Sequence, residues 1–332
     1  MSNRRRYAVA APFLVGVVVL LAFGSLAVGA RSTGPDVVWS ALTTPGTADG
    51  DHLVVLARLA RTVDGLVVGA SLGLAGATMQ AITRNPLADP GILGVNAGAS
   101  VAVILALALG VGSLPGIALA ATVGALVAFV VVYAIAALSP GGPQPITLAI
   151  GGAAVGAGLT SVVAAIALLR PAALERFRFW QAGVLGTRGV ESVPGVAVFL
   201  VVGAVLCLAT ARALNQLSLG DDVARSLGSH VAAVRALAAL GAVMLAGTAT
   251  ALVGPIGFVG LVVPHLVRLT CGPDHRFLLP LSMLAGAALL LGADIVGRTA
   301  APPGEIAVGI MTALLGAPVM VVLVHRRVRV RL

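Results

Sequence analysis

The sequence has no lysine among its 332 residues, and charged side chains make up only 10% of the chain. A soluble globular domain carries about 25% charged residues, so this chain has too few to cover a water-exposed surface of its length. Hydrophobic residues account for 59% of the chain, and the mean hydropathy is +1.07. These values predict a polytopic membrane protein.

The absence of lysine also limits the chemistry of the chain. A nucleotide-binding P-loop places a lysine on the phosphates, so this chain cannot supply one. If it takes part in ATP-driven transport, another subunit must bind the ATP. The formal net charge is +9. In a soluble protein that charge would suggest nucleic acid, but in a membrane protein arginines gather in cytoplasmic segments. We therefore expect no nucleic-acid partner.

Cysteine is scarce as well. The two cysteines, Cys207 and Cys271, lie in or beside apolar runs. They are expected to be small core-filling side chains and not a disulfide or a metal site. No nucleophile with a neighbouring base stands out, and no cluster has the spacing of metal ligands. We therefore expect neither an enzyme nor a bound cofactor or metal.

What the chain does have is apolar runs of about 20 residues, the length that crosses a bilayer. Ten such spans are expected in a single transmembrane domain over residues 1–332. They cover residues 7–30, 62–83, 92–112, 115–138, 146–169, 193–211, 232–252, 256–270, 277–297 and 305–324.

An even number of spans places both ends of the chain on one side of the membrane. Arginines are more numerous in the segments assigned to the inner side, which predicts that both termini are cytoplasmic. The first run is longer than the roughly 7–15 apolar residues of a signal peptide. We expect it to be a retained helix, with cleavage after residues 27–30 as the alternative.

The stretch 58–100 organises the rest of the chain. Residues 31–57 before it are polar and turn-rich, and they are expected to lie outside the membrane. Pro86 and Pro90 bracket a turn at which the helix must end. Within the helix, small residues recur every four positions and predict a face where another helix can approach closely. They are Gly65, Gly69, Gly73 and Ala77.

Three arginines at the expected outer face are the first candidate site: Arg58, Arg61 and Arg298. Arginine pairs with carboxylates through two parallel hydrogen bonds, so such a group could dock an acidic soluble partner. The alternative is local pairing within helices, of Arg61 with Asp64 and of Arg298 with Asp294. The residues alone leave both open.

The second candidate is the polar loop 212–231 on the expected inner side. Within it, residues 217–228 could form a short amphipathic helix that fits a groove of a partner. Ser218 or the pair Asp221 and Asp222 could cap this helix, and Gly228 could end it. The alternative is a plain connecting loop.

Breaks rich in glycine and proline at 85–94, 139–145 and 254–264 are the third candidate. Irregular backbone at membrane depth is tolerated where protein or a water-filled cavity covers it, and broken helices often mark a transport path. Simple packing bends are the alternative. Acidic residues near a span are limited to Asp64 and Asp294 at span ends, which argues against proton coupling.

At these motifs the sequence resembles the FecCD-type permease family. The resemblance extends over nearly the whole chain, and the motifs keep the family's order. The matching pieces are RLAR at 58–61, GASLGLAGATMQ at 69–80, RNPLADPGILGVNAGA at 84–99, LSLGDDVARSLG at 217–228, GPIGFVGLVVPHLVRL at 254–269, DHRFLLPLSMLAGA at 274–287, ADIVGR at 293–298 and GEIAVGIMTALLGAP at 304–318.

The resemblance implies the all-α fold of type II ABC importer permeases, with about ten transmembrane helices. Such permeases sit in the cytoplasmic membrane of prokaryotes. It also implies the partners: ABC ATPase subunits on the cytoplasmic side, an extracytoplasmic substrate-binding protein, and a second permease, either a homodimer copy or a sister chain.

The resemblance assigns three sets of site residues. Binding-protein docking falls on Arg58, Arg61 and Arg298. Contact with the ATPase falls on Leu217, Ser218, Leu219, Gly220, Asp221, Asp222, Ala224, Arg225, Leu227 and Gly228. A cytoplasmic gate falls near Gln144, Pro145, Ile146 and Thr147, where this sequence lacks the adjacent hydroxyl pair of some relatives.

The expected function is translocation of an iron–siderophore-type metal chelate, powered by a separate ATPase subunit. Haem and cobalamin remain alternative cargoes. An ion-coupled secondary transporter is the rival from another class, and a structural or signalling membrane protein is a third interpretation.

Overall fold

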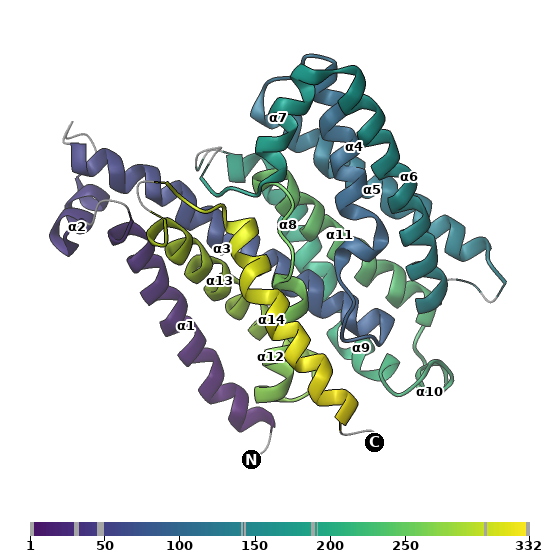
Figure 1. The fold of residues 1–332 in the computed structure, drawn as a ribbon. Helices are drawn as coiled ribbons and strands as arrows, with labels where there is room; N and C mark the ends of the chain where they lie inside the picture. Colours follow the sequence, from purple (N-terminus) through teal and green to yellow (C-terminus); the bar gives the residue numbers. More distant parts are fainter. Residues whose placement is uncertain are drawn as a thin grey trace.

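The structure is a computed structural model that describes residues 3–29, 33–44, 50–140, 142, 144–186, 190, 192–301 and 304–329. These residues form helices and loops, without a strand among them (Figure 1). The helices are α1 (Asn3–Ala27), α2 (Pro35–Thr43), α3 (Gly50–Thr83), a 3-10 helix η1 (Pro90–Leu93), α4 (Val95–Ala108), α5 (Leu114–Leu138), α6 (Pro145–Leu169), α7 (Pro171–Gln181), α8 (Ser192–Ala209), α9 (Ala211–Leu217), α10 (Asp221–Ser226), α11 (Val231–Val253), α12 (Val259–Cys271), α13 (His275–Thr299) and α14 (Val308–Arg329).

The long helix α3 packs closely on α13 through its glycine face. A Cβ atom at Gly69 would lie 2.5 Å from the backbone oxygen of Gly286, and one at Gly73 would collide with the backbone of Ser282. Backbones can approach this closely only where side chains are absent on the contact line. The predicted close-packing face is therefore confirmed.

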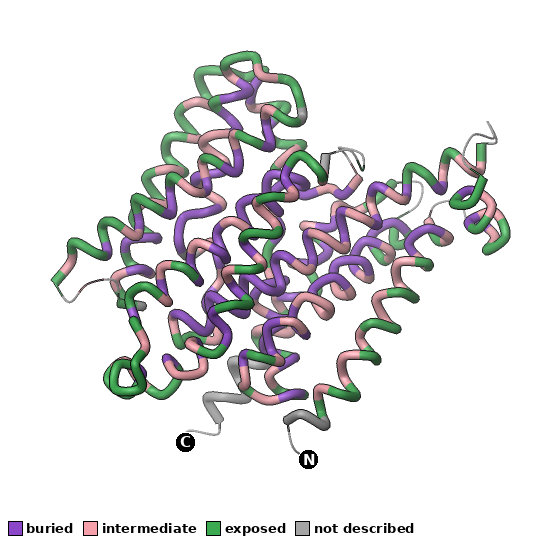
Figure 2. The backbone as a smooth tube through the Cα atoms, turned by 180° about the vertical axis from the view of Figure 1, so that it is seen from behind, coloured by how far each residue is buried: buried purple, intermediate pink, exposed green. Residues whose placement is uncertain are grey.

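A second buried helix, α11, lies between α3, α5 and α8. The buried residues follow α3, α11 and α13 through the interior, whereas α1 and α6 lie at the outside (Figure 2). Cys207 in α8 and Cys271 in α12 are both free and buried, as expected of core-filling side chains.

Two helical segments extend beyond the expected pattern. The helix expected over 62–83 already begins at Gly50, and the stretch 31–57 contains α2. The start of α2 carries ordinary helix signals, with proline in the first turn beside Asp36. Hydropathy marks the apolar part of a helix and not its first residue, so in the sequence the polar turns of α3 resemble a loop.

By length and hydropathy, five of the described helices can cross a membrane, or six if the pair α8 and α9, bent by 47°, is one span. The five are α1, α5, α6, α11 and α13. Three shorter apolar helices, in α4, α12 and α14, add to these. The expectation of ten spans with the stated bounds stays a prediction. The fold itself agrees with the expected all-α class.

The two ends of the molecule differ in what they carry. The first residues of α1 and the last described residues of α14 lie at the same end as α10 (Figure 1). The start of α3 and helix α2 lie at the opposite end. Candidate residues at the two ends of α3 are therefore far apart.

Candidate functional site

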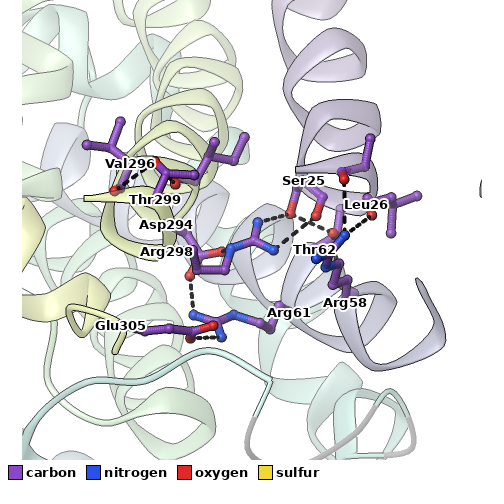
Figure 3. Close-up of polar contacts among 12 residues, drawn as sticks. Ser25, Leu26, Arg58, Arg61, Thr62, Asp294, Val296, Arg298, Thr299 and Glu305 are labelled. Carbon is purple, nitrogen blue, oxygen red and sulfur yellow. Dashed lines mark hydrogen bonds and ion pairs between the residues drawn. The ribbon is translucent and has the colours of Figure 1, made fainter. Parts of the chain in front are cut away.

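One end of α3 carries a group that we call the arginine cluster, made of Arg58, Arg61, Asp294, Arg298 and Glu305. Arg61 forms ion pairs with Asp294, at 2.8 Å, and with Glu305 (Figure 3). Arg298 lies on the other side of Asp294, with Nε 3.0 Å from Oδ2. One carboxylate on α13 thus joins two arginines that come from different helices.

Arg58 and Arg298 also bind the end of α1. Arg58 donates hydrogen bonds to the carbonyl oxygens of Leu26 and Ala27, at 3.0 and 3.1 Å. Arg298 donates to the carbonyl and the hydroxyl of Ser25, at 3.1 and 2.9 Å. The last carbonyl groups of a helix lack partners within it and carry negative partial charge, so a guanidinium there is favourable.

The accessible part of the arginine cluster is small. Arg58 and Arg298 are only 8% and 2% exposed. The side chain of Arg61 is 16% exposed and that of Glu305 is 42% exposed. Burial lowers the pKa of Arg61, just outside the expected span 62–83, but the nearby carboxylates of Asp294 and Glu305 outweigh it and raise the pKa overall. The Arg61–Glu305 pair is therefore the surface that a partner can reach.

Of the two ion pairs that the local-pairing alternative names, the structure contains one. The expected pair of Asp294 with Arg298 is present. Arg61 instead pairs with residues more than 200 positions away, and Asp64 accepts a hydrogen bond from the backbone N–H of Gly186 at 2.9 Å. Glu305 was not singled out from the sequence, although it is an acid that closely follows Arg298 in the chain.

The other end of α3 lies near the short helix α10. Gly220 precedes it with φ of +114°, and no side chain caps its first turn. The expected capping by Ser218 or by the two aspartates is therefore wrong, although Asp221 and Asp222 do occupy the first turn, where negative charge is favourable.

The end of α10 follows the prediction for Gly228. This residue has φ of +84° and donates to the carbonyl of Arg225 at 2.9 Å. Ser229 donates to the carbonyl of Ala224 at 3.0 Å, which completes a Schellman motif. Two glycines in backbone conformations that suit them thus set both ends of α10.

The two faces of the segment 217–228 differ in burial. Leu217 and Ala224 are buried against the body of the protein. Three apolar side chains, which we call the exposed apolar row, are open to the surroundings: Leu219, Val223 and Leu227 are 63%, 44% and 55% exposed. Val223 lies in α10, and the other two lie just before and just after it. Exposed apolar side chains in and beside a short helix are suited to a protein partner.

The gate candidates lie beside α10. Gln144 lines a cavity of about 600 Å³ together with Asp221, Arg225, His230 and Arg235. The Thr147 hydroxyl donates to the carbonyl of Gln144 at 2.8 Å, and Ile146 is exposed. The backbone of Pro145 begins α6, and its side chain lies outside the described part of the chain.

The arginine cluster and α10 lie at opposite ends of one continuous helix. From Arg58 to Thr83, α3 extends about 37 Å at 1.5 Å per residue, which exceeds the roughly 30 Å of a bilayer's hydrocarbon core. The structure does not bring the docking and the coupling candidates together, and it separates them by a membrane thickness. Among the described residues, no group of three or more His, Cys, Asp or Glu could hold a metal ion.

Comparison with known proteins gives a consistent result. A model of the FecCD transport family matches residues 17–326. The ferric enterobactin transport system permease protein FepD of Escherichia coli (strain K12) is 44% identical over 97% of this chain and 96% of its own length. The hemin transport system permease protein HmuU of Yersinia pestis is 36% identical over 95% of each chain.

A solved structure is similar over the same extent. It is a metal-chelate type ABC transporter in an inward-facing conformation. The match covers 96% of this chain and 99% of that one, with a TM-score of 0.83 and 30% identity. The helices described above are therefore arranged as in that transporter.

Proposed function

Because this chain belongs to the FecCD transport family, we propose that it is the permease subunit of an ABC importer that carries an iron–siderophore chelate across the cytoplasmic membrane. The observation that carries the proposal is the 44% identity to the ferric enterobactin permease over almost the full length of both chains. The family's members are transport subunits and not enzymes. Haem is the second candidate cargo, supported by the 36% identity to the hemin permease.

The energy comes from a partner chain. Without a lysine the permease has no P-loop of its own, so ABC ATPase subunits bind and hydrolyse the ATP. The exposed apolar row of Leu219, Val223 and Leu227 supports docking of these subunits on α10. Asp222 and Arg225 flank that row, exposed to solvent, and add a polar rim to the surface.

An extracytoplasmic binding protein docks on the arginine cluster. Its three arginines outnumber its two acids, so an acidic partner is attracted to this end of the molecule. Docking would replace Glu305 on Arg61 by a carboxylate of the partner. Arg58 and Arg298 contribute mainly by holding α1, because both are buried.

A second permease subunit covers α6. This helix is largely exposed, and its exposed positions include Gly158, Thr160 and Ser161. Small residues and hydroxyls fit contact between helices better than contact with lipid. The second subunit would be another copy of this chain or a sister permease, and the chelate would pass between the two, through the gate formed near Gln144, Ile146 and Thr147 at the cytoplasmic end.

The rival function is an ion-coupled secondary transporter. It would need a titratable group within the pathway, and it would stop when a protonophore collapses the proton gradient. Asp64 and Asp294, the two acids that the sequence places at span ends, are both buried, with partners at one end of the bundle. That placement favours a structural use of both carboxylates.

The deciding experiment is uptake of ferric enterobactin and of haem into proteoliposomes that contain the permease with its ATPase and binding protein. We expect uptake of the siderophore chelate that needs internal ATP and resists a protonophore. Uptake without the ATPase, or stopped by the protonophore while ATP is present, would overturn the proposal. Preference for haem would select the second cargo.

The same assay tests docking with a matched pair of variants. Arg61→Glu should weaken the affinity for the binding protein about tenfold, because it removes the accessible guanidinium and adds a like charge for an acidic partner. Arg178→Glu on α7 changes the net charge equally at an exposed arginine outside the cluster. Equal affinities for the two variants would remove the docking role.

A further inference from the structure

Asp221, the first residue of α10, joins this short helix to two others. Its Oδ1 accepts a hydrogen bond from Nη2 of Arg235 in α11 at 2.9 Å, and its Oδ2 forms an ion pair with Nη1 of the same arginine at 2.9 Å. It also forms an ion pair with Arg84, the residue that follows α3. One side chain therefore connects α10 to the end of α3 and to the first turns of α11.

The neighbouring acid, Asp222, is paired within α10 itself. Asp222 pairs with Arg225 inside α10 at 2.7 Å, and its side chain is 97% exposed. The two adjacent aspartates thus differ in their partners: Asp221 pairs with arginines outside α10, and Asp222 pairs with an arginine within α10.

Both basic partners of Asp221 are held in place. The Arg235 side chain is only 7% exposed, so its charge depends on the Asp221 carboxylate for compensation. Arg84 has φ of +48°, a left-handed conformation that is uncommon outside glycine. That conformation turns the chain directly after α3, at the residue that meets Asp221.

We propose that Asp221 is the positioning residue through which a movement of α10 reaches α3 and α11. The proposal rests on the function proposed above, in which the ATPase docks on α10. A carboxylate held by both terminal nitrogens of an arginine has a fixed geometry, so α10 cannot shift without moving Arg235 or breaking the pair. The apolar contacts of Ala224 lack that directionality.

The gate candidates lie on the same route. Gln144, Asp221 and Arg235 line one cavity, so a shift of the Asp221–Arg235 pair changes the wall that faces Gln144. The other partner, Arg84, follows the helix whose far end carries the arginine cluster. Asp221 thus lies where the ATPase surface, the gate segment and α3 meet.

The test compares three variants in the complete reconstituted importer: Asp221→Asn, Asp221→Glu and Asp222→Asn. The measured quantity is chelate taken up per ATP hydrolysed. In importers that assemble with the ATPase, we expect Asp221→Asn to lower this ratio about tenfold, the size of an ordinary coupling free energy. Asp221→Glu, which keeps the carboxylate, should restore much of the ratio.

Asp222→Asn removes the same charge from the same helix. It should keep the wild-type ratio even where it weakens ATPase binding, because it leaves the Asp221 link intact. Equal ratios for Asp221→Asn and Asp222→Asn would overturn the proposal. If Asp221→Asn fails to assemble, Arg235→Lys decides the question. It keeps the charge but loses the two-nitrogen contact, so it should lower the ratio, and an unchanged ratio would refute the link.

A second readout separates this proposal from the function on which it rests. Amide hydrogen exchange on the permease alone should become faster over residues 231–235 at the start of α11 in Asp221→Asn and stay unchanged there in Asp222→Asn. Uptake by the wild type that needs no ATPase would refute the proposed function. Unchanged exchange in Asp221→Asn would refute the link whatever the wild type transports.

Discussion

Two buried arginines close the end of α1, and this role explains why residues expected at a docking surface are inside the protein. Arg58 and Arg298 donate to the last carbonyl groups and the hydroxyl of residues 25–27. The sequence grouped these two arginines with Arg61 as one candidate site, and the structure places all three near the end of α1. The sequence could not predict that Arg58 and Arg298 are buried, because their burial depends on α1 ending beside α3 and α13.

At single glycines the packing of α3 leaves no room for a side chain. We predict that Gly73→Leu lowers the thermal stability of the purified permease, because the new side chain would collide with the backbone of Ser282. Overpacking in a tight interior costs roughly 1–3 kcal/mol, and a backbone collision costs at least the upper part of that range. Thermal unfolding in lipid nanodiscs measures the effect.

The control for that prediction is Gly16→Leu in α1. No atom lies within 4 Å of a Cβ placed at Gly16, so the same change meets open space there. It should leave the melting temperature unchanged or raise it slightly, because leucine favours a helix over glycine. A melting temperature for Gly73→Leu equal to that of the control would contradict the close packing.

At the scale of elements, α10 shows how far sequence reasoning reaches. Its end at Gly228 followed from turn chemistry that the local sequence contains, but α10 covers only Asp221–Ser226 and not the whole expected stretch 217–228. The sequence did not predict its start. Gly220 forms the N-cap of α10, and no side chain accepts a hydrogen bond from the N–H groups of the first turn. The early start of α3 and the presence of α2 were missed because polar helical turns resemble loops when only hydropathy is read.

The exposed row on α10 gives the prediction at this scale. Val223→Asp should weaken binding of the ATPase subunit by about 2 kcal/mol, or ~30-fold in Kd, because a charge would be buried at the centre of an apolar contact. Val223→Ile keeps the apolar surface and should bind as the wild type does. Binding of the purified ATPase to the permease in nanodiscs measures both. Wild-type affinity of Val223→Asp would exclude α10 as the docking helix.

The two groups of candidate site residues lie at opposite ends of the molecule, separated by the length of α3. Composition was enough to predict a membrane protein made of helices, and the motif resemblance was enough to predict its family. The arrangement of the helices could not be derived from hydropathy, because apolar runs of similar length do not specify their neighbours. The pairing of Arg61 with Glu305 and of Asp221 with Arg84 depends on that arrangement.

Sidedness is the prediction for the whole molecule. The native cysteines are buried, so a membrane-impermeant maleimide should leave the wild type unlabelled. Ser226→Cys in α10 should react only from the cytoplasmic side, and Ala301→Cys after α13 only from the outside, since both positions are exposed at opposite ends of the bundle. Labelling of both cysteines from one side of sealed vesicles would contradict the proposed topology.

The continuous helix α3 has a mechanical consequence. It is held at mid-length, where glycines bring its backbone against α13, and it carries charged groups at both tips. A rigid rod that rocks about a central fulcrum swings its tips in opposite directions. A tilt of α3 about this contact would therefore move Arg84 and Arg61 in opposite directions, so a displacement at one end of the helix would be accompanied by a displacement at the other.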